Sequence, residues 1–192
     1  MTIALLALVA YLLGSIPFGL WLVKAWKGID VREVGSGNIG TTNVYRAAGK
    51  GAAIAVFLLD AAKGTLPVAL ALWLNLGAWA AVGVGAAAIL GHSKSIFLGF
   101  TGGKSVATGI GTVLALSPVG AAIALAIWGA VFATTRMVSL GSIVAAVALP
   151  GILYALGAPM PYLIFVAAAA LYVVVRHRAN IQRLLAGKEN RL

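Results

Sequence analysis

A glycine-rich polar segment, residues 35–46 (Gly-Ser-Gly-Asn-Ile-Gly-Thr-Thr-Asn-Val-Tyr-Arg), carries residue types that bind anions. Its glycines allow main-chain N–H groups to converge on an oxyanion, and its Ser, Thr and Asn side chains add short hydrogen-bonding groups. Arg46, at its end, has the planar guanidinium that suits two-pronged contact with a phosphate. The segment therefore predicts a phosphate-binding loop.

A second segment, Gly91–Ser105, has two lysines with hydroxyls nearby and ends in Gly-Gly-Lys-Ser. This end resembles the tail of a phosphate-binding P-loop, but the complete GxxxxGK[ST] spacing needs a glycine where Leu98 stands. A nucleotide-hydrolysing function is therefore rejected. The Gly-Gly-Lys-Ser end is still suited to bind an anion. Gly102 and Gly103 give the main chain conformational freedom, and Lys104 adds its charge to the positive end of an expected helix.

Asp60 and Lys63 stand three residues apart in an apolar stretch, so they share one helix face within pairing reach. An isolated charge in that setting is costly. They form either a self-neutralising pair that fixes helix packing or a functional pair, in which Lys63 attracts an anion and Asp60 holds it in place. Pro67, shortly afterwards, predicts a break or kink in the same helix.

The composition is that of a membrane protein, because 62% of the 192 residues are hydrophobic, 9% are charged and the mean hydropathy is +1.05. The net charge of +10 does not indicate nucleic-acid binding, since the basic residues flank apolar segments instead of gathering on a solvated face. No cysteine occurs, which excludes disulfides and a thiolate nucleophile. The N-terminus lacks the basic region of a cleavable signal peptide, so we expect a retained first span.

Membrane helices must position these residues. Seven apolar stretches predict an all-α polytopic protein that forms a single domain over residues 1–192. The expected spans are residues 3–26, 51–76, 78–91, 105–116, 119–134, 139–156 and 161–176. Several are short, since 12 residues cover only about 18 Å of a hydrocarbon core of about 30 Å. Either polar motif residues extend these helices, or the cytoplasmic half is a cavity that admits water.

Every Lys and Arg except Lys63 falls on one side of this arrangement of spans. The positive-inside rule then predicts an N-terminus outside the cell and a C-terminus in the cytoplasm. On the same side, Ser139 caps the sixth span or contacts a ligand. The segment after the last span has an apolar stripe typical of an interfacial amphipathic helix, while His177 and Asn180 are near enough to the membrane to face a site.

Taken together, these segments resemble the acyl-phosphate:glycerol-3-phosphate acyltransferases, integral membrane enzymes of bacteria that make lysophosphatidic acid. The family patterns GSGNxGxTNxxR, DxxKG and HxxNIxRLxxGxE are matched by residues 35–46, 60–64 and 177–189. A further pattern, GHxxPxFLxFxGGKGVAT, is matched with two departures: Ser95 stands where proline is usual and Ser105 where glycine is usual. Ser105 adds a side chain beside the expected phosphate contact. The resemblance covers nearly the whole chain.

The resemblance implies a set of site residues drawn from these patterns. The catalytic candidates are Ser36, Arg46, His92 and Lys104. The substrate-binding candidates are Gly37, Asn38, Thr41, Asn43, Lys63, Gly102, Gly103, Ser142, His177 and Asn180. The implied location is the inner (plasma) membrane of a bacterial cell, with the site at its cytoplasmic face.

The resemblance also implies acyl phosphate as donor and glycerol-3-phosphate as acceptor, in the first acylation of phospholipid biosynthesis. Other acyltransferases use a His-x-x-x-x-Asp motif, but Phe97 stands where that aspartate would follow His92. Because phosphate leaves a mixed anhydride readily, the enzyme mainly has to bind two anions, align a hydroxyl and stabilise an oxyanion. The four acidic residues lie outside the glycine-rich motifs, so we expect no metal and no other cofactor.

The group that accepts the hydroxyl proton has three interpretations. His92 is the protein candidate, because the ordinary pKa of histidine is near neutrality, but this residue is equally suited to hydrogen-bonding the loop. Alternatively, the phosphate of glycerol-3-phosphate, with a second pKa of about 6, is the base within its own substrate. We expect direct transfer in a ternary complex, since neither Ser36 nor Ser142 has a sequence-evident base for forming an acyl-enzyme.

Two other classes of function compete with an enzyme. A channel or carrier for a phosphorylated solute is favoured by the intramembrane Lys63 and disfavoured by the lack of basic residues on the outer face. A scaffold subunit leaves the polar motifs without a purpose. We therefore expect the partners to be the two substrates and the lipid bilayer, with no nucleic acid and no obligate protein partner.

Overall fold

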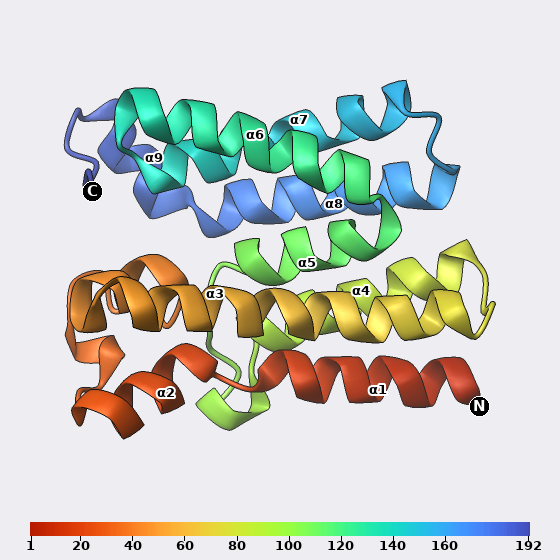
Figure 1. Ribbon diagram of the computed structural model, residues 1–192, viewed down its shortest axis with the longest axis horizontal. Helices are drawn as coiled ribbons and strands as arrows, with labels where there is room; N and C mark the ends of the chain where they lie inside the picture. Colours follow the sequence, from red (N-terminus) through yellow and green to blue (C-terminus); the bar gives the residue numbers. More distant parts are fainter. The chain divides into compact units, whose positions relative to one another are not determined.

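The structure is a computed structural model that describes all 192 residues and contains nine α-helices and two short 3₁₀ helices. In chain order the elements are α1 (Thr2–Ser15), α2 (Phe18–Lys27), η1 (Val31–Glu33), α3 (Thr41–Trp73), α4 (Ala78–Ser93), η2 (Ile96–Leu98), α5 (Val106–Leu116), α6 (Pro118–Thr135), α7 (Val138–Ala155), α8 (Met160–Arg176) and α9 (Arg178–Leu185) (Figure 1). The extended residues form one isolated bridge, between Ser95 and Thr101. The all-α prediction is confirmed.

Four helical stretches are long and apolar enough to cross a membrane, namely Thr2–Lys27, Thr41–Trp73, Pro118–Thr135 and Val138–Ala155. A fifth results if α8 and α9, bent by 62° at their junction, count as one span. The apolar helices α4 and α5 are shorter, with 16 and 11 residues. These stretches coincide with the seven expected ones, so the polytopic membrane class is confirmed and the count of about seven includes two short helices.

The chain forms two compact units, Met1–Ala115 and Leu116–Leu192. In the first unit, α1 packs against α4 and α3. The contact with α4 is close because glycines stand at the crossing: a Cβ at Gly14 would collide with the Ala88 carbonyl oxygen, and one at Gly91 with the Tyr11 carbonyl oxygen. Small residues allow helix backbones to approach in this way where lipid provides no hydrophobic drive between them.

The first apolar stretch is broken between Ser15 and Phe18, where Pro17 stands. In Figure 1, α2 leaves the line of α1 at an angle. This helix packs on a local core with η1 and the beginning of α3, to which Val23, Val31 and Val44 contribute fully buried side chains. The first expected span, residues 3–26, therefore coincides with the candidate span Thr2–Lys27, but it is divided into two helices at this point. Proline lacks the N–H that the helix ladder needs, and the chain turns there.

The long helix α3 differs from the second expected span in two ways. It begins at Thr41, so the second half of the glycine-rich motif is helical instead of forming a loop. Its single non-helical residue is Gly49, with φ 85° and ψ −177°, values that only glycine adopts without strain. The expected break at Pro67 is absent, because α3 continues through this residue to Trp73.

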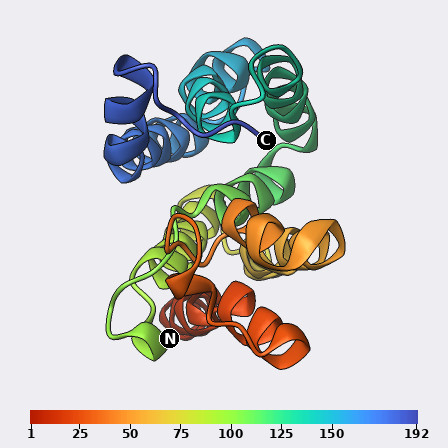
Figure 2. The same ribbon diagram turned by 90° about the vertical axis from the view of Figure 1, so that its left-hand side faces the viewer.

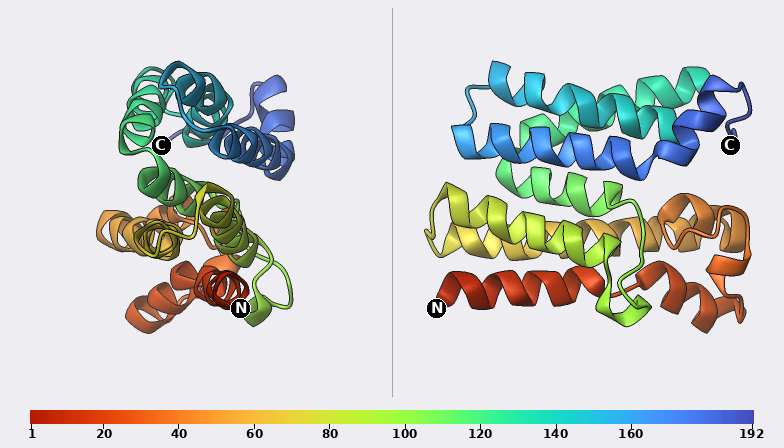
Figure 3. Two further views of the ribbon diagram at one scale, coloured as in Figure 1. Left: turned by 90° about the vertical axis from the view of Figure 1, so that its right-hand side faces the viewer. Right: turned by 180° about the vertical axis from the view of Figure 1, so that it is seen from behind.

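In the second unit, α7 packs against both α6 and α8, and the right-hand view of Figure 3 shows α7 and α8 side by side. Rings of Trp128 and Phe132 stack within α6, with centroids 5.2 Å apart. The residues after α9 cross back toward the end of α6 (Figure 2). There the Arg136 Nε donates to the Leu192 main-chain oxygen at 2.8 Å, and the Leu192 N–H donates to the Arg136 carbonyl at 2.9 Å.

Candidate functional site

The glycine-rich motif owes its local shape to Asn43. Its Nδ2 donates to the Val31 carbonyl at 2.7 Å and the Val34 carbonyl at 2.9 Å, and its Oδ1 accepts from the Ser36 N–H at 3.0 Å. Gly35, with φ +59°, lies so close to Asn43 that a Cβ would collide with this Oδ1. The buried amide therefore shapes the segment, and the expectation that Asn43 contacts substrate stays a prediction.

Other members of the motif face outward. Ser36, Gly37 and Arg46 are exposed, as an anion-binding role requires. Asn38 is half-buried and its Oδ1 accepts from the Gly40 N–H at 2.9 Å, which orients its amide. At the first position of α3, the Thr41 Oγ1 is buried and has no hydrogen-bond partner within the protein. A buried hydroxyl without a partner is costly, so this atom is suited to contact a ligand.

The second glycine-rich segment lies between α4 and α5. The Gly103 N–H donates to the His92 carbonyl at 3.2 Å, and the Ser95 N–H donates to the Thr101 carbonyl at 3.0 Å. Lys104 is half-buried and directly precedes Ser105 and α5, which begins at Val106. The prediction that Lys104 stands at a helix N-terminus is confirmed. Its ammonium and the positive helix end can therefore act together on an anion.

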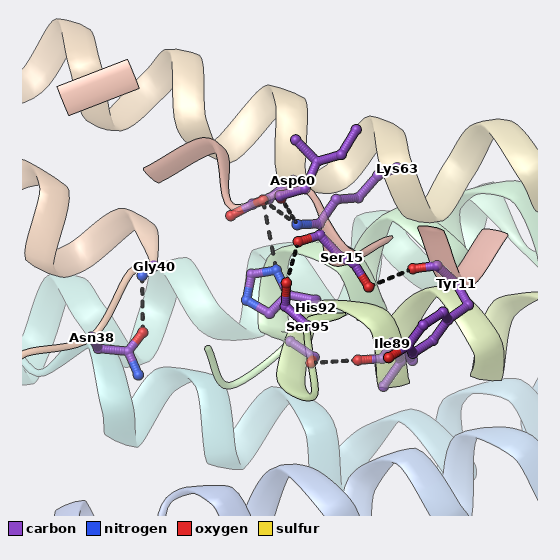
Figure 4. A network of polar contacts seen from close by, with 11 residues as sticks. Tyr11, Ser15, Asn38, Gly40, Asp60, Lys63, Ile89, His92 and Ser95 are labelled. Atoms are coloured by element: carbon purple, nitrogen blue, oxygen red, sulfur yellow. Dashed lines mark hydrogen bonds and ion pairs between the residues drawn. The ribbon is translucent and has the colours of Figure 1, made fainter. Parts of the chain in front are cut away.

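Asp60 and Lys63 form a buried ion pair in the middle of α3, with the Lys63 Nζ 2.7 Å from the Asp60 Oδ1 (Figure 4). Their side chains are 2% and 3% exposed. The Lys63 Nζ also donates to the Ile16 carbonyl at 3.0 Å and lies 5.6 Å from the centre of the Phe18 ring. Lys63 therefore ties α3 to the break between α1 and α2. This geometry matches the packing alternative, and a contact between Lys63 and substrate stays a prediction.

His92 lies beside this pair. Its side chain is 4% exposed, and its Nδ1 is 3.6 Å from the Asp60 Oδ1 (Figure 4). On the other side of the ring, a Cβ at Gly103 would collide with the His92 Nε2. The imidazole thus lies between the ion pair and the second glycine-rich segment. This position suits a role in holding the loop, and both roles expected for His92 stay predictions.

A hydrogen-bonded chain at the end of α1 was not predicted from the sequence. The Ser95 Oγ donates to the Ser15 carbonyl at 2.6 Å, the Ser15 Oγ to the Tyr11 carbonyl at 2.8 Å, and the Tyr11 hydroxyl to the Lys94 carbonyl at 2.8 Å (Figure 4). These bonds join α1 to the start of the loop that ends at Lys104. The available signal was Tyr11 and Ser15, spaced one helical turn apart in an apolar stretch.

In the second unit, Ser142, His177 and Asn180 are all buried. The Ser142 Oγ donates to the Val138 carbonyl at 2.9 Å, and the His177 Nδ1 is 2.8 Å from the Val173 carbonyl oxygen. Both contacts are made one turn back along the same helix, and they orient the two side chains. Asn180 instead donates from its Nδ2 to the Glu189 Oε1 at 2.6 Å.

Glu189 is the centre of a polar cluster that the sequence did not reveal. Its Oε1 also accepts from the Ser139 Oγ at 2.7 Å, and its Oε2 from the Arg183 Nε at 2.8 Å. Burial raises the pKa of Glu189, but the hydrogen bonds from Ser139, Asn180 and Arg183 outweigh it and hold this pKa below its ordinary value. Ser139 therefore does not cap α7, whose N-cap residue is Met137, and its hydroxyl donates to Glu189 instead.

Asp30, at the surface of the first unit, is a second carboxylate whose pKa is lowered by hydrogen bonds. Hydrogen bonds from the Arg32 side chain and main chain hold the pKa of Asp30 at about 2, below its ordinary value of 3.8. The pair caps the short helix η1, where the Asp30 carboxylate accepts from the Arg32 N–H. No group of three or more His, Asp or Glu side chains is placed to hold a metal ion.

Fold and site together define a helical integral membrane protein whose polar segments present glycines, hydroxyls, an arginine and a lysine to an anion. The family model described as glycerol-3-phosphate acyltransferase matches residues 4–187. The chain is 50% identical over 188 residues to the glycerol-3-phosphate acyltransferase of Synechococcus sp. (strain JA-3-3Ab), covering 98% of this chain and 92% of the relative. A second relative of the same name, from Synechococcus sp. (strain JA-2-3B'a(2-13)), is 50% identical over 193 residues, covering 100% and 96%.

Two solved structures are also similar. The crystal structure of PlsY (YgiH), an integral membrane glycerol 3-phosphate acyltransferase, in its glycerol 3-phosphate form matches with a TM-score of 0.96 and 42% identity, covering 100% of this chain and 96% of that one. Its lysophosphatidic acid form matches with a TM-score of 0.94 and 41% identity, with the same coverage. The chain belongs to the glycerol-3-phosphate acyltransferase family.

Proposed function

We propose that this acyltransferase takes its fatty acyl group from acyl phosphate and transfers it to the hydroxyl of glycerol-3-phosphate, releasing phosphate and lysophosphatidic acid. The observation that carries the proposal is the presence of two separate polar, glycine-rich segments in the first unit, one with exposed Ser36 and Arg46 and one with Lys104 just before α5. Two such segments suit two phosphate-bearing substrates. This activity is the first acylation in phospholipid biosynthesis.

The individual roles follow from exposure and from bonds already made. Arg46 and Lys104 neutralise phosphate groups, while Ser36 and Thr41 provide hydroxyls. The main chain at Gly37, Gly102 and Gly103 approaches the ligand closely, and Asn38 adds its amide. In the second unit, the proposed substrate-binding residues are Ser142, His177 and Asn180. The match of the family model to residues 4–187 supports a single acyltransferase domain over residues 1–192.

The proton of the attacking hydroxyl passes to the phosphate of glycerol-3-phosphate. This route is favoured because His92 is held between Asp60 and Gly103, and because the Glu189 carboxylate already accepts three hydrogen bonds. A phosphate with a second pKa of about 6 is a competent base near neutral pH. Transfer is then direct, without an acyl-enzyme, and needs neither a metal nor another cofactor.

The enzyme lies in the inner (plasma) membrane of a bacterium, with the N-terminus outside and the C-terminus and site in the cytoplasm. The distribution of Lys and Arg supports this orientation. Because the chain has no cysteine, single cysteines placed at Thr2 and at Lys188 can be labelled with a membrane-impermeant maleimide in whole cells. Labelling at position 188 but not at position 2 would reverse the proposed orientation.

Purified protein in detergent tests the reaction. We expect phosphate release from an acyl phosphate that depends on glycerol-3-phosphate and persists in EDTA, without any added protein partner. The competing function is a channel or carrier for a phosphorylated solute. Such a protein moves a solute between two compartments, so in detergent it would release no phosphate from acyl phosphate. Lys104→Gln should lower kcat/KM by about 100-fold, mainly through KM, because a hydrogen bond to a charged group contributes about 1.5–3 kcal/mol. Lys94→Gln, an exposed lysine of the same segment, is the matched control and should stay within about twofold.

A further inference from the structure

Ser105 has a backbone conformation that side chains normally avoid. Its φ is +60°, in the left-handed region that favours glycine, and only three other non-glycine residues of the chain have positive φ. A serine at this position persists only if its surroundings hold it there. The residue directly follows Lys104, so its conformation affects the direction of the main chain at that lysine.

The Ser105 side chain points into the protein. It is buried, and its Oγ donates a hydrogen bond of 2.9 Å to the Ile89 carbonyl inside α4. Its own carbonyl accepts from the Gly109 N–H at 2.7 Å, a bond of the first turn of α5. Ser105 therefore connects the C-terminal part of α4 to the N-terminus of α5, and its hydroxyl is bonded inside the protein.

The main chain is thus attached to α4 on both sides of Lys104. On one side the Gly103 N–H donates to the His92 carbonyl at 3.2 Å, and on the other the Ser105 Oγ donates to the Ile89 carbonyl. The two acceptors stand three residues apart, about one turn, on the same helix. A lysine whose backbone is held at both neighbours loses less freedom when it binds an anion.

We propose that Ser105 is a positioning residue, which fixes the backbone of Lys104 at the start of α5 and so lowers the KM for the substrate whose phosphate Lys104 binds. The inference rests on the proposed function of Lys104. It assigns to Ser105 an effect on substrate binding with little effect on the chemical step, because Ser105 does not touch the reacting atoms.

Three variants separate the hydrogen bond from the backbone conformation. Ser105→Gly loses the hydrogen bond and also relieves the left-handed strain, so its Tm should stay within about 2 °C of the wild type while KM rises about three- to tenfold. Ser105→Ala loses the bond but keeps the strain, so KM should rise and Tm should fall. Thr112→Val removes another buried hydroxyl of α5, which donates to the Thr108 carbonyl, and should lower Tm without changing KM.

The measurements are KM and kcat for both substrates in detergent, with Tm recorded on the same samples. The affected substrate is identified as the one whose KM rises in Lys104→Arg, and Ser105→Gly should raise the same KM with kcat within about twofold. An unchanged KM in Ser105→Gly, or an equal rise in Thr112→Val, would overturn the inference while leaving the acyltransferase reaction intact. A wild-type protein that releases no phosphate from acyl phosphate would instead contradict the proposed function, and this inference with it.

Discussion

Asp60 in the first unit and Glu189 in the second both have buried carboxylates, but the negative charges of these carboxylates are compensated in different ways. Asp60 is 2% exposed and faces a lysine that is itself 3% exposed. Glu189 is 4% exposed but accepts hydrogen bonds from Ser139, Asn180 and Arg183, of which only the 38% exposed arginine is charged. Asp60 depends on a buried lysine with His92 beside it, whereas Glu189 depends on several hydrogen-bond donors.

The difference decides how each cluster responds to damage. Removing one partner of a buried ion pair leaves an uncompensated charge away from water, which costs far more than the pair contributes. In the Glu189 cluster, the loss of one donor leaves two others, and the exposed arginine can be hydrated. We therefore expect the first unit to be sensitive to single substitutions in its cluster and the second to be tolerant.

Asp60→Ala should have the largest effect. It leaves the Lys63 ammonium buried without its counter-charge and should lower the free energy of unfolding by about 3–5 kcal/mol. The measurement is thermal or denaturant unfolding in detergent. The control is Asp60→Asn/Lys63→Met, which removes both charges and should lose less unfolding free energy than the single variant. A larger loss in the double variant would contradict the comparison.

Glu189→Ala should have the next largest effect, about 2–3 kcal/mol, because it leaves the buried Ser139 and Asn180 donors without an acceptor. Glu189→Gln keeps an acceptor oxygen and should lose only about 1 kcal/mol. The same unfolding assay compares the two. If Gln were as damaging as Ala, the charge and not the number of hydrogen bonds would hold this cluster.

The pH dependence of stability sharpens the same point. The pKa of Glu189 is lowered by folding, so its contribution is present above the unfolded value of 4.5 and is lost as pH falls through the lower folded-state pKa. The Tm difference between wild type and Glu189→Gln should therefore be constant from about pH 7 to about pH 5.5 and narrow below 4.5. Asp30, with a pKa of about 2, does not titrate in that window. A difference that widened on acidification would contradict the assignment.

Arg183→Gln should have the smallest effect, below about 1 kcal/mol, since its side chain is 38% exposed and a partly exposed ion pair is screened by water. Added salt should reduce the loss further. A loss comparable with that of Asp60→Ala would show that the second cluster depends on charge as much as the first does.

The membrane helices were well predicted and the helix breaks were not. The predicted borders of the last five spans lie close to those of α4 to α8, because an apolar stretch long enough to enter a bilayer is a local property of the chain. The sequence missed the break before Phe18 and the early start of α3 at Thr41, and it predicted a break at Pro67 that is absent. Whether a proline or glycine bends a helix depends on the neighbours that satisfy its backbone, which periodicity does not contain.

For the candidate site, the sequence identified the polar segments but not which of their residues are exposed and which are buried. Ser36, Gly37 and Arg46 are exposed as an anion-binding loop requires, whereas Asn43, Lys63 and His92 are buried and bonded inside the protein. All six lie in polar motifs and look equally suited to bind a substrate. Glu189, which organises its cluster, was only a member of a motif.

The sequence by itself determined the membrane class, the family and the segments that carry polar chemistry, because these depend on residue type and spacing along the chain. Only the tertiary structure decided which polar side chains are available and which hold others in place. Asp60, His92 and Gly103 are far apart in the chain and meet only when α3, α4 and the loop before α5 pack together. Burial and hydrogen bonding are set by such contacts, so the sequence pattern alone does not distinguish a residue that contacts substrate from one that holds the fold.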